Sequence, residues 1–561
     1  MKILLTTLHS KYSHASLALP CLASCCAGIG GLGIEIREFT VNEPREQLLR
    51  LIMAGQAGMV AFSCYIWNIE KTLRIAADIK GIAPETLILL GGPEASFGVF
   101  ELMHDNPAVD FVIKGEGEAI FARLAALMAD SGGAVPDGAL LQDIPNLFYR
   151  DGDDIASGPL DRGHIELDSI PSPFEAGLVD LSRPLTYCET SRGCPFSCAF
   201  CLSSVEGRVR SFSMGRITSD LLFLMERKVP KIKLVDRTFN YDDSRAREIW
   251  GFILMHNQGS HFHFEIAADL LTDQAIELLR QVPEGTFRFE IGIQSASHRA
   301  LELAGRKSDL GRVFYVIRRL LAETKVELHL DLVAGLPEEG YAGFLSSLRA
   351  VCDLQPQVIQ VEPLKVLKGS PMREIAARGD YRFSSFPPYT VLRTPWLSYG
   401  EICRIETIGR LLDLFHNQGG FATAFRYLAL REGAAELYDR MAVTAGDRQL
   451  AGCATLRRYE LFFELACSGR PADDDRLADA LFFDFCTAEL PRRGKLPGFI
   501  ARREGECSWP GGRDESGGRS RQFRFTFRRD YRKQPWNDSP AEITFSYPRI
   551  SDRADTARAP F

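Results

Sequence analysis

The sequence of 561 residues has no excess of basic residues: 66 Lys and Arg stand against 73 Asp and Glu, a formal net charge of -7. A chain with this balance has no general electrostatic affinity for nucleic acid or for an anionic membrane surface. The sequence also lacks two paired C-x2-C motifs, which a structural zinc site of four ligands usually needs. These absences make nucleic acid and membrane unexpected as partners.

A long, strongly apolar segment of the kind that spans a membrane is also missing. The stretch from Ala15 to Ile34 is uncharged and long enough for a span, but Pro20, four Gly and several Ser and Cys lower its hydrophobicity. A strand predicted at Lys2 to Thr7 already precedes it, where an export signal would place its apolar core. We therefore interpret the stretch as the first helix of an α/β unit, with an export signal as the alternative.

Fourteen cysteines are scattered through the chain, and their one tight cluster has the spacing of a metal site. Cys194, Cys198 and Cys201 form a C-x3-C-x2-C triplet. Three thiolates on one loop hold three irons of a [4Fe-4S] cubane and leave the fourth iron open for a small chelating ligand. A zinc site completed by Cys188 is the alternative. Scattered cysteines with one metal-spaced cluster, and the oxygen sensitivity of such a cluster, both predict a reducing compartment, so we expect a cytoplasmic protein.

The triplet, with the aromatic Phe200 just before its third cysteine, resembles the signature of the radical S-adenosylmethionine (radical SAM) enzymes. In that family the amino and carboxylate groups of SAM chelate the open iron, and one electron from the cluster cleaves SAM to a 5'-deoxyadenosyl radical. Lys2 to Glu118 resembles the cobalamin-binding module that precedes the radical domain in one branch of the family. The resemblance implies a [4Fe-4S] cluster, SAM and cobalamin as cofactors, Phe200 as a cofactor-binding residue, and an electron donor such as flavodoxin or ferredoxin.

The first domain, predicted at residues 1–160, alternates strand and helix. Strands are expected at residues 3–5, 34–39, 59–63, 87–90 and 111–113, each separated from the next by a helical segment. This order predicts an N-terminal doubly wound, Rossmann-like parallel sheet. Ligands of such sheets bind beyond the carboxyl ends of the strands, so the polar or small residues there are the candidates for a cofactor site.

Two glycine-rich segments at those strand ends, Gly91 to Glu94 and Gly115 to Glu118, look like cobalamin-domain segments of that branch. Glycine lets the backbone approach a ligand closely, and Ser63 offers a hydroxyl to the nucleotide tail of a corrin. The candidate cofactor-binding residues of this domain are Ser63, Gly91, Gly92, Glu116 and Gly117. Turn glycines of an ordinary α/β fold are the alternative. The D-x-H-x-x-G motif by which many cobalamin proteins supply a histidine to cobalt is absent, so we expect no such ligand.

A linker is predicted at residues 161–184, because this stretch is rich in Pro, Ser and Gly. A radical SAM domain is then predicted at residues 185–373, with strands at 185–188, 231–235, 263–267, 288–293, 327–333 and 358–363. Six βα units are too few to close an eight-stranded barrel, so they predict a partial (β/α)6 TIM-like barrel with one open side. The cysteine loop follows the first strand directly, at the end where barrel active sites lie. This placement argues against zinc.

Charged and amide side chains near the ends of the barrel strands are further cofactor candidates. Such groups can hold ribose hydroxyls or the ammonium of methionine through charge-assisted hydrogen bonds. Arg306 follows the fourth strand, and the resemblance implies that it holds the methionine carboxylate. A layer of structural salt bridges in the barrel is the alternative for any one of them. The candidate residues are Asp236, Glu290, Gln294, Arg306 and Asp331.

The last domain, predicted at residues 374–561, resembles a C-terminal domain of unassigned function found in this branch. Helical periodicity runs through 399–418 and 434–466, and alternation of aromatic and polar residues predicts a terminal β-hairpin with strands at 522–528 and 542–548. Interleaved Arg and aromatic residues also fit an RNA-binding tail, but one buried strand face explains both residue types. A Gly/Ser/Asp-rich loop is predicted from Cys507 to Ser520.

These observations predict an enzyme that transfers a methyl group to an unidentified substrate. One SAM would methylate cobalamin, and a second would yield the radical that removes hydrogen from an unactivated carbon. A radical rearrangement, oxidation or cyclisation without methyl transfer is the alternative among enzymes. An iron-sulfur redox or RNA-associated binding module is the alternative from another class.

Overall fold

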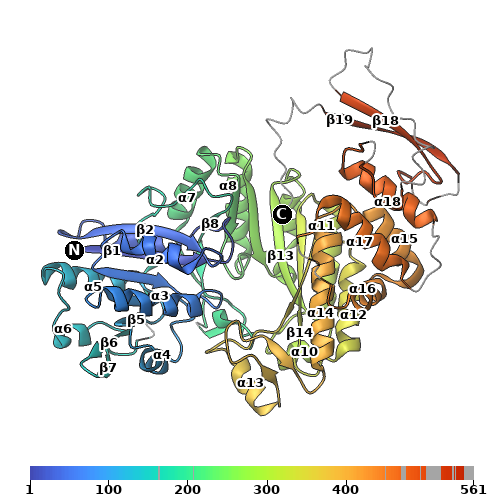
Figure 1. Ribbon diagram of the computed structural model, residues 1–561. Coiled ribbons are helices and arrows are strands. Elements are labelled where there is room, and N and C mark those ends of the chain that lie inside the picture. Colours follow the sequence, from blue (N-terminus) through green and yellow to red (C-terminus); the bar gives the residue numbers. More distant parts are fainter. Residues whose placement is uncertain are drawn as a thin grey trace. The chain divides into compact units, whose positions relative to one another are not determined.

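The computed structural model describes the chain apart from residues 162–163, 206, 449, 451, 469–474, 493–494, 501–519, 534–535, 537–538 and 549–561. Figure 1 shows the helices and strands along the chain, which comprises two compact units. The first comprises Met1–Ile291, Glu302–Glu327 and Lys365–Leu392. The second comprises Gly292–Leu301, Leu328–Leu364 and Arg393–Phe561.

The N-terminal part of the chain forms a seven-stranded sheet in the order β2-β1-β3-β4-β5-β6-β7. The first five strands are parallel, whereas β6 and β7 are antiparallel. The predicted doubly wound parallel sheet is thus confirmed, and the antiparallel hairpin at its edge was missed. The strands are β1 (Lys2–His9), β2 (Gly33–Thr40), β3 (Met59–Ser63), β4 (Leu87–Gly91), β5 (Phe111–Ile113), β6 (Leu147–Asp151) and β7 (Asp154–Ser157).

Helices cover both faces of this sheet, because successive strand residues alternate between two apolar clusters. Leu4 of β1 lies in one cluster, and its neighbours Ile3 and Leu5 lie in the other. The uncharged stretch after β1 contains helix α1, whose Leu19 is buried in the second cluster. No helix in the part of the chain that the structure describes is long and apolar enough to cross a membrane. The helices are α1 (Ala18–Cys25), α2 (Arg45–Met53), α3 (Ile69–Ile82), α4 (Val99–Asp105), α5 (Glu118–Asp130) and α6 (Gly138–Gln142).

The predicted linker packs closely on the barrel. Leu167, Ile170 and Phe174 are all buried, and Ser172 Oγ donates a hydrogen bond to Asp220 of α7 (Met214–Glu226). A short 3-10 helix, η1 (Leu167–Ser169), lies in this segment. The boundaries of the domains remain a prediction.

The central sheet has six strands in the order β15-β14-β13-β12-β11-β8, so that neighbours in sequence are neighbours in the sheet. This order confirms the partial (β/α)6 barrel. The strands are β8 (Thr186–Cys188), β11 (Lys231–Leu234), β12 (His261–Ile266), β13 (Phe287–Gln294), β14 (Glu327–Ala334) and β15 (Val358–Pro363). Helices between them are α7, α8 (Asp243–His256), α9 (Asp273–Leu279), α10 (His298–Leu303), α11 (Leu310–Glu323) and α12 (Tyr341–Cys352), with 3-10 turns η2 (Leu202–Val205) and η3 (Ala268–Leu270).

Burial alternates strictly along the barrel strands. Phe262 and Phe264 of β12 are fully buried, and Phe264 packs against Trp250 of α8. The residues between them in sequence, such as His263 and Glu265, are polar and only half-buried. Since side chains of a strand point alternately to opposite faces, one face is apolar and covered by helices, and the other carries polar groups.

The last part of the chain is mainly helical, as predicted. The structure divides the predicted helical stretches into shorter helices: α14 (Tyr399–Leu412) with a π-helical turn η4 (Asp413–Asn417), α15 (Ala422–Glu432), α16 (Ala434–Ala445), α17 (Thr455–Cys467) and α18 (Asp475–Ala488). Before them stand α13 (Met372–Arg378), β16 (Arg382–Phe383) and β17 (Val391–Arg393).

The terminal β-hairpin is also present, formed by β18 (Ser520–Phe527) and the antiparallel β19 (Ala541–Pro548). Phe525 and Phe527 are buried, whereas the side chain of Arg524 is 60% exposed. The arginine therefore lies on a solvated face, as the alternating pattern predicts. The predicted loop from Cys507 lies outside the described residues up to Ser520, where β18 begins.

Candidate functional site

The cysteine loop begins directly after β8, and backbone contacts hold it in place. Its first residues form a short strand, β9 (Ser191–Arg192), which pairs with β10 (Arg210–Ser211). Ala199 N donates to Ala304 O at 2.8 Å, and Met372 N donates to Ala199 O at 2.9 Å. Gly305 has φ +68° and lies so close that an added Cβ would be 2.9 Å from Ser197 O. Only glycine fits there without a shift of the loop.

The three cysteines of the loop differ in their surroundings. Cys194 Sγ lies 3.4 Å from Thr238 Oγ1, whereas Cys198 is 5% exposed and its Sγ accepts a hydrogen bond from Arg306 Nη1 at 3.7 Å. Burial raises the pKa of the Cys198 thiol, and the Arg306 guanidinium opposes that rise. A cation beside a thiol favours the thiolate, which is the form that binds iron. The donor set of three thiols on one loop therefore fits a cluster with one open iron.

Cys188 points away from this loop. It is 1% exposed on β8, on the opposite face of the strand from Tyr187. Burial, reinforced by the nearby Asp220, holds the pKa of its thiol well above the ordinary value. The side chain of Cys188 therefore belongs to the apolar core, and the zinc site that it was to complete lacks this fourth ligand.

Asp236 follows β11 and is completely buried. Its carboxylate accepts hydrogen bonds from the backbone N–H of Thr190 at 3.1 Å and from the hydroxyls of Thr190 and Ser191. Arg245 Nη2 lies 3.5 Å from the same carboxylate. These contacts fix the start of the cysteine loop, and the predicted contact of Asp236 with SAM stays a prediction.

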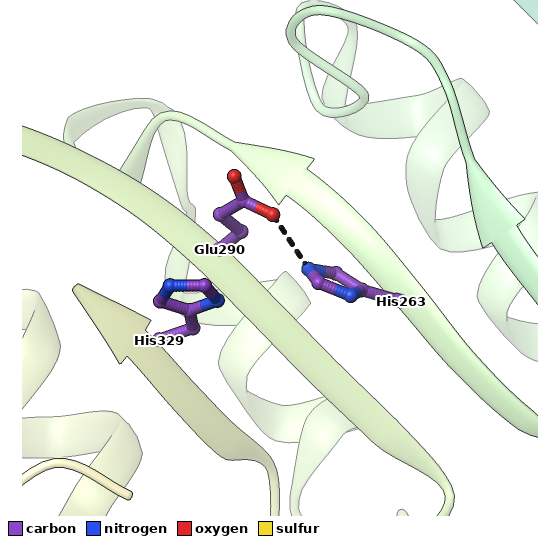
Figure 2. A group of neighbouring side chains, drawn as sticks. All are labelled: His263, Glu290 and His329. Atoms are coloured by element: carbon purple, nitrogen blue, oxygen red, sulfur yellow. Dashed lines mark ion pairs between the residues drawn. The ribbon is translucent and has the colours of Figure 1, made fainter. Parts of the chain in front are cut away.

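Glu290 lies in an ion-paired layer on the polar face of the barrel. Its Oε2 is 2.8 Å from Lys233 Nζ. The same oxygen is 2.8 Å from His263 Nε2, and Figure 2 shows this pair. Lys233 also pairs with Glu265 at 3.3 Å. Although burial opposes it, the two carboxylates raise the pKa of Lys233, which stays protonated. For Glu290 the structure supports the layer of salt bridges that the sequence left as the alternative.

The other two strand-end candidates lie in the second unit. Asp331 of β14 has its Oδ1 3.1 Å from Nε2 of His329, which Figure 2 also draws. Gln294 ends β13 with φ +68°, a left-handed conformation that turns the chain sharply there. The next residue, Ser295, is buried and donates to Glu339 Oε1 at 2.6 Å. Their predicted contacts with SAM stay predictions.

The carboxyl ends of β3 and β4 in the N-terminal sheet lie against each other. Gly91 O accepts a hydrogen bond from Cys64 N at 2.8 Å, and Ser63 O accepts one from Thr7 Oγ1 at 2.9 Å. Gly92 has φ +96°, and a Cβ there would lie 2.7 Å from Cys64 O. The close approach that requires glycine at position 92 is therefore to the neighbouring loop. The predicted contact of Gly92 with cobalamin stays a prediction.

Glu116 forms ion pairs with two arginines of the barrel part. Arg192 Nη1 lies 3.4 Å from Glu116 Oε1, and Arg210 forms a shorter contact with the same oxygen. Burial raises the pKa of Glu116, but the hydrogen bond from Arg210 and the charges of Arg192 and Arg210 together outweigh it, so the pKa is lowered. Gly117 precedes α5, where a Cβ would lie 3.2 Å from Leu22 Cδ2. Both residues have contacts within the chain, and their predicted contact with cobalamin stays a prediction.

Sequence reasoning missed two aromatic residues after β3. Tyr65 and Trp67 stack with ring centroids 4.4 Å apart, and Trp67 is 44% exposed although its Nε1 donates to Leu8 O at 3.1 Å. Trp67 lines a pocket of about 330 Å³ together with Ile66, Glu70, Lys365, Pro387 and Pro388. The available signal was a large aromatic residue in the loop just beyond an apolar strand, at the edge of the sheet where ligands bind.

A histidine of the N-terminal domain contacts the first barrel strand. His14, in the loop after β1, has its Nδ1 3.0 Å from the hydroxyl of Tyr187 of β8. Burial lowers the pKa of His14, and the nearby His9 lowers it further. No sequence pattern indicates this pair, because the two residues are 173 positions apart.

Three family models match successive parts of the chain. A B12 binding domain matches residues 3–125, the radical SAM superfamily matches residues 188–351, and a protein of unknown function (DUF4080) matches residues 379–508. The fold and the cysteine loop define a radical SAM protein. With its B12 binding domain, the chain belongs to the cobalamin-binding branch of the radical SAM enzymes.

Two curated relatives cover about two thirds of the chain. A 2-(S-pantetheinyl)-carbapenam-3-carboxylate methyltransferase of Streptantibioticus cattleyicolor is 24% identical over 399 residues, which are 66% of this chain and 56% of that protein. A hopanoid C-3 methylase of Methylococcus capsulatus is 26% identical over 398 residues, 68% of this chain and 73% of that protein. The chain spans about half the length of the first of these relatives.

A solved structure shares the fold. The cobalamin-dependent S-adenosylmethionine radical enzyme OxsB, solved with aqua-cobalamin and S-adenosylmethionine bound, aligns with a TM-score of 0.59 at 14% identity. The alignment covers 86% of this chain and 83% of that one. This likeness confirms the predicted order of a Rossmann-like sheet followed by a partial barrel.

Proposed function

We propose that the chain is a cobalamin-dependent radical SAM methyltransferase. The observation that carries the proposal is the contact between the two loops that would hold the two cofactors. Arg192, two residues before Cys194, pairs with Glu118 at 2.6 Å, and Glu118 opens the helix after β5 of the B12 binding domain. Cofactors of both modules bind at the carboxyl ends of strands, so the contact brings those two edges together.

Cys194, Cys198 and Cys201 would hold the [4Fe-4S] cluster, with SAM chelated to its open iron. When bound, the cluster supplies the electron that cleaves SAM, and cobalamin supplies methyl-transfer chemistry. The chain's own residues position these groups: Asp236 fixes the start of the cysteine loop, Gly305 lets the loop pack closely, and the Arg306 guanidinium lies beside Cys198. Arg306 is also the residue proposed to hold the SAM carboxylate.

Cobalamin would lie at the carboxyl edge of the N-terminal sheet. Ser63, Gly91, Gly92, Glu116 and Gly117 lie at or next to this edge, as does the exposed Trp67. No D-x-H-x-x-G motif is present in the sequence, so no histidine is expected on cobalt. The names of both curated relatives describe methyl transfer, which favours methylation over rearrangement, oxidation or cyclisation.

The partners and the compartment are part of the proposal. Cleavage of SAM needs an external electron, so we expect a donor such as flavodoxin or ferredoxin. The oxygen-sensitive cluster and the free cysteines fit the reducing cytoplasm. Nucleic acid is not expected as a partner, because the arginine of the hairpin lies on an ordinary solvated strand face.

The proposal is tested with SAM that carries a deuterium-labelled methyl group. Anaerobically purified, cluster-loaded protein is incubated with this SAM, hydroxocobalamin, a reductant and a small-molecule extract of a strain that lacks the gene. Formation of 5'-deoxyadenosine together with a compound that carries the labelled methyl group supports the proposal. Formation of 5'-deoxyadenosine with an unlabelled new product supports rearrangement, oxidation or cyclisation instead. Absence of 5'-deoxyadenosine favours a binding module.

A further inference from the structure

Carboxylates at the carboxyl edge of the N-terminal sheet contact later segments of the first unit at two places. Glu118 and Glu116 of the segment after β5 both pair with Arg192. Glu94 of the segment after β4 accepts a hydrogen bond from the hydroxyl of Tyr389, and Lys368 Nζ lies 3.3 Å from it. The acidic residues of the two glycine-rich segments, Gly91 to Glu94 and Gly115 to Glu118, therefore form contacts with residues of later segments of the chain.

The pairs around Arg192 are well shielded from water. The side chain of Arg192 is 14% exposed, that of Glu118 is 9% exposed and that of Glu116 is 20% exposed. Arg192 also pairs with Glu189 of its own loop at 3.0 Å. Buried ion pairs are screened far less than surface pairs, so removal of Arg192 would take from Glu118 and Glu189 the cation that they share, whereas Glu116 would keep its pair with Arg210.

Arg192 connects two segments that are 74 residues apart. On one side, it is two residues before Cys194, and its strand β9 starts the cysteine loop. On the other side, Glu118 is the first residue of α5 and Gly117 is its N-cap, so Arg192 holds the segment through which β5 turns into that helix. Arg192 therefore links the two loops directly, and Arg210 of β10 adds a second link through Glu116.

We propose that Arg192 is a positioning residue that couples retention of cobalamin to loading of the iron-sulfur cluster. The inference rests on the proposed function. Bonds from a cluster to Cys194 would fix the cysteine loop and with it the guanidinium of Arg192. A fixed Arg192 holds the segment after β5 in its binding conformation. Corrin binding then costs less conformational entropy. Because such coupling is reciprocal, corrin binding also stabilises the loaded loop.

The experiment measures the dissociation constant of hydroxocobalamin, by anaerobic spectrophotometric titration, for cluster-loaded and cluster-free protein. Wild-type protein is expected to bind the corrin roughly 5- to 150-fold more tightly when the cluster is present. Arg192→Gln should bring this ratio close to one while the iron content remains that of the wild type. Arg247→Gln is the matched control, because among the described residues Arg247 forms its ion pair within α8, with Asp243 at 2.7 Å. It should keep the wild-type ratio.

A second measurement needs no corrin. Cluster loading should slow hydrogen exchange of the amides at residues 114–121 in wild-type protein and leave them unchanged in Arg192→Gln. If Arg192→Gln fails to fold, Glu118→Gln removes the same contact from the other side and should give the same two results.

The outcomes separate the inference from the proposed function. A wild-type ratio near one, or an Arg192→Gln ratio equal to that of the wild type, overturns the coupling while corrin binding itself still supports the function. If loaded wild-type protein binds no corrin, the cobalamin part of the function fails. The amide exchange of residues 114–121 then tests alone whether cluster loading orders this segment through Arg192. Exchange that does not change when the wild-type protein is loaded overturns the inference.

Discussion

The two large sheets of the molecule differ in what covers their faces. All five residues of β3 in the N-terminal sheet are buried, and the residues of its strands alternate between two apolar clusters. In the barrel, β12 alternates between buried and half-buried residues, and the half-buried ones are polar. The first sheet has two apolar faces, whereas the second has only one.

This difference decides where each module can carry out chemistry. A sheet that is apolar on both faces leaves only the loops at its strand ends for a ligand. The barrel can place charged groups along the whole length of its polar face, and Lys233, Glu265 and Glu290 use it for ion pairs. A charged residue on a barrel strand is therefore a weaker indication of a cofactor than a polar residue at the edge of the N-terminal sheet.

The largest expected effect comes from the cysteines, and it compares the loop that follows β8 with the apolar side of that strand. Replacement of Cys194, Cys198 or Cys201 by Ala should each abolish the visible iron-sulfur absorption and the reductive cleavage of SAM, because each removes one of three iron ligands. Cys188→Ala removes a thiol from the apolar side and should leave both intact. Absorption spectra and 5'-deoxyadenosine assays after anaerobic reconstitution measure this. Loss of the cluster in Cys188→Ala would show that the apolar side supplies a ligand after all.

A buried carboxylate that has no cation beside it should affect the pH dependence of stability differently from the paired carboxylates of the barrel. Asp484 of α18 is buried, accepts hydrogen bonds from Thr423 N at 3.0 Å and Ala424 N at 2.8 Å, and has no ion pair among the described residues. Burial raises its pKa from 3.8 to about 7, against these hydrogen bonds. The folded protein thus keeps a proton that the unfolded chain releases, and stability is lost as the pH rises through about 7.

Asp484→Asn should remove this pH dependence, since the amide oxygen still accepts a hydrogen bond and cannot ionise. Wild-type stability attributable to Asp484 should be complete below about pH 4 and fall by up to roughly 4 kcal/mol above about pH 7. Urea unfolding of both proteins across this range measures the difference. Equal pH slopes for the two proteins would mean that Asp484 is ionised throughout.

Two adjacent glycines test how tightly the edge of the N-terminal sheet is packed. Gly92→Ala should destabilise the protein by about 3 kcal/mol, because the Cβ meets the backbone of Cys64 and the residue must keep a positive φ. Gly91→Ala is the matched control, since a Cβ there meets nothing within 4 Å. Thermal unfolding of both variants measures the effect. A stable Gly92→Ala protein with normal folding but poor corrin retention would restore the view that the cofactor imposes this glycine.

The smallest expected effects are on SAM binding and on stability. They distinguish Arg306, beside the cysteine loop, from Glu290, in the ion-paired layer. Arg306→Ala should weaken SAM binding by about 1.5–3 kcal/mol, roughly 10- to 150-fold, with little change in melting temperature. Glu290→Gln should do the reverse, because it breaks the pairs with Lys233 and His263 and lowers stability by about 1.5–3 kcal/mol. Binding titrations and melting curves measure both. If Glu290→Gln instead weakens SAM binding at normal stability, the polar face reaches the cofactor.

The fold was predictable from the sequence where local pattern decides it. Apolar runs between Gly, Pro and Ser located the parallel strands, and the C-x3-C-x2-C spacing located the cysteine loop. The β6–β7 hairpin also carries a local signal, because its two turn residues are Gly152 and Asp153, and Gly at the first position of a two-residue turn is typical of hairpins.

The partners of the site residues were not predictable in the same way. Glu290 is 57 residues from Lys233, and Glu118 is 74 residues from Arg192, so only the folded sheet brings each pair together. The spacing of Gly91, Gly92 and Glu116 suggested a ligand, but no local pattern indicates that Gly92 approaches Cys64 or that Glu116 meets Arg210. Residue type and strand position identify candidate site residues. Only the tertiary contacts show which of them already have partners within the chain.

The measurement that tests the account most directly is the corrin content of cluster-loaded protein. Anaerobically reconstituted protein is incubated with hydroxocobalamin and separated from free corrin by gel filtration. The account predicts about one corrin per chain at the edge of the N-terminal sheet, with the spectrum of cobalamin that lacks a protein histidine ligand. Protein that carries a full cluster and cleaves SAM, yet retains no corrin, would contradict it.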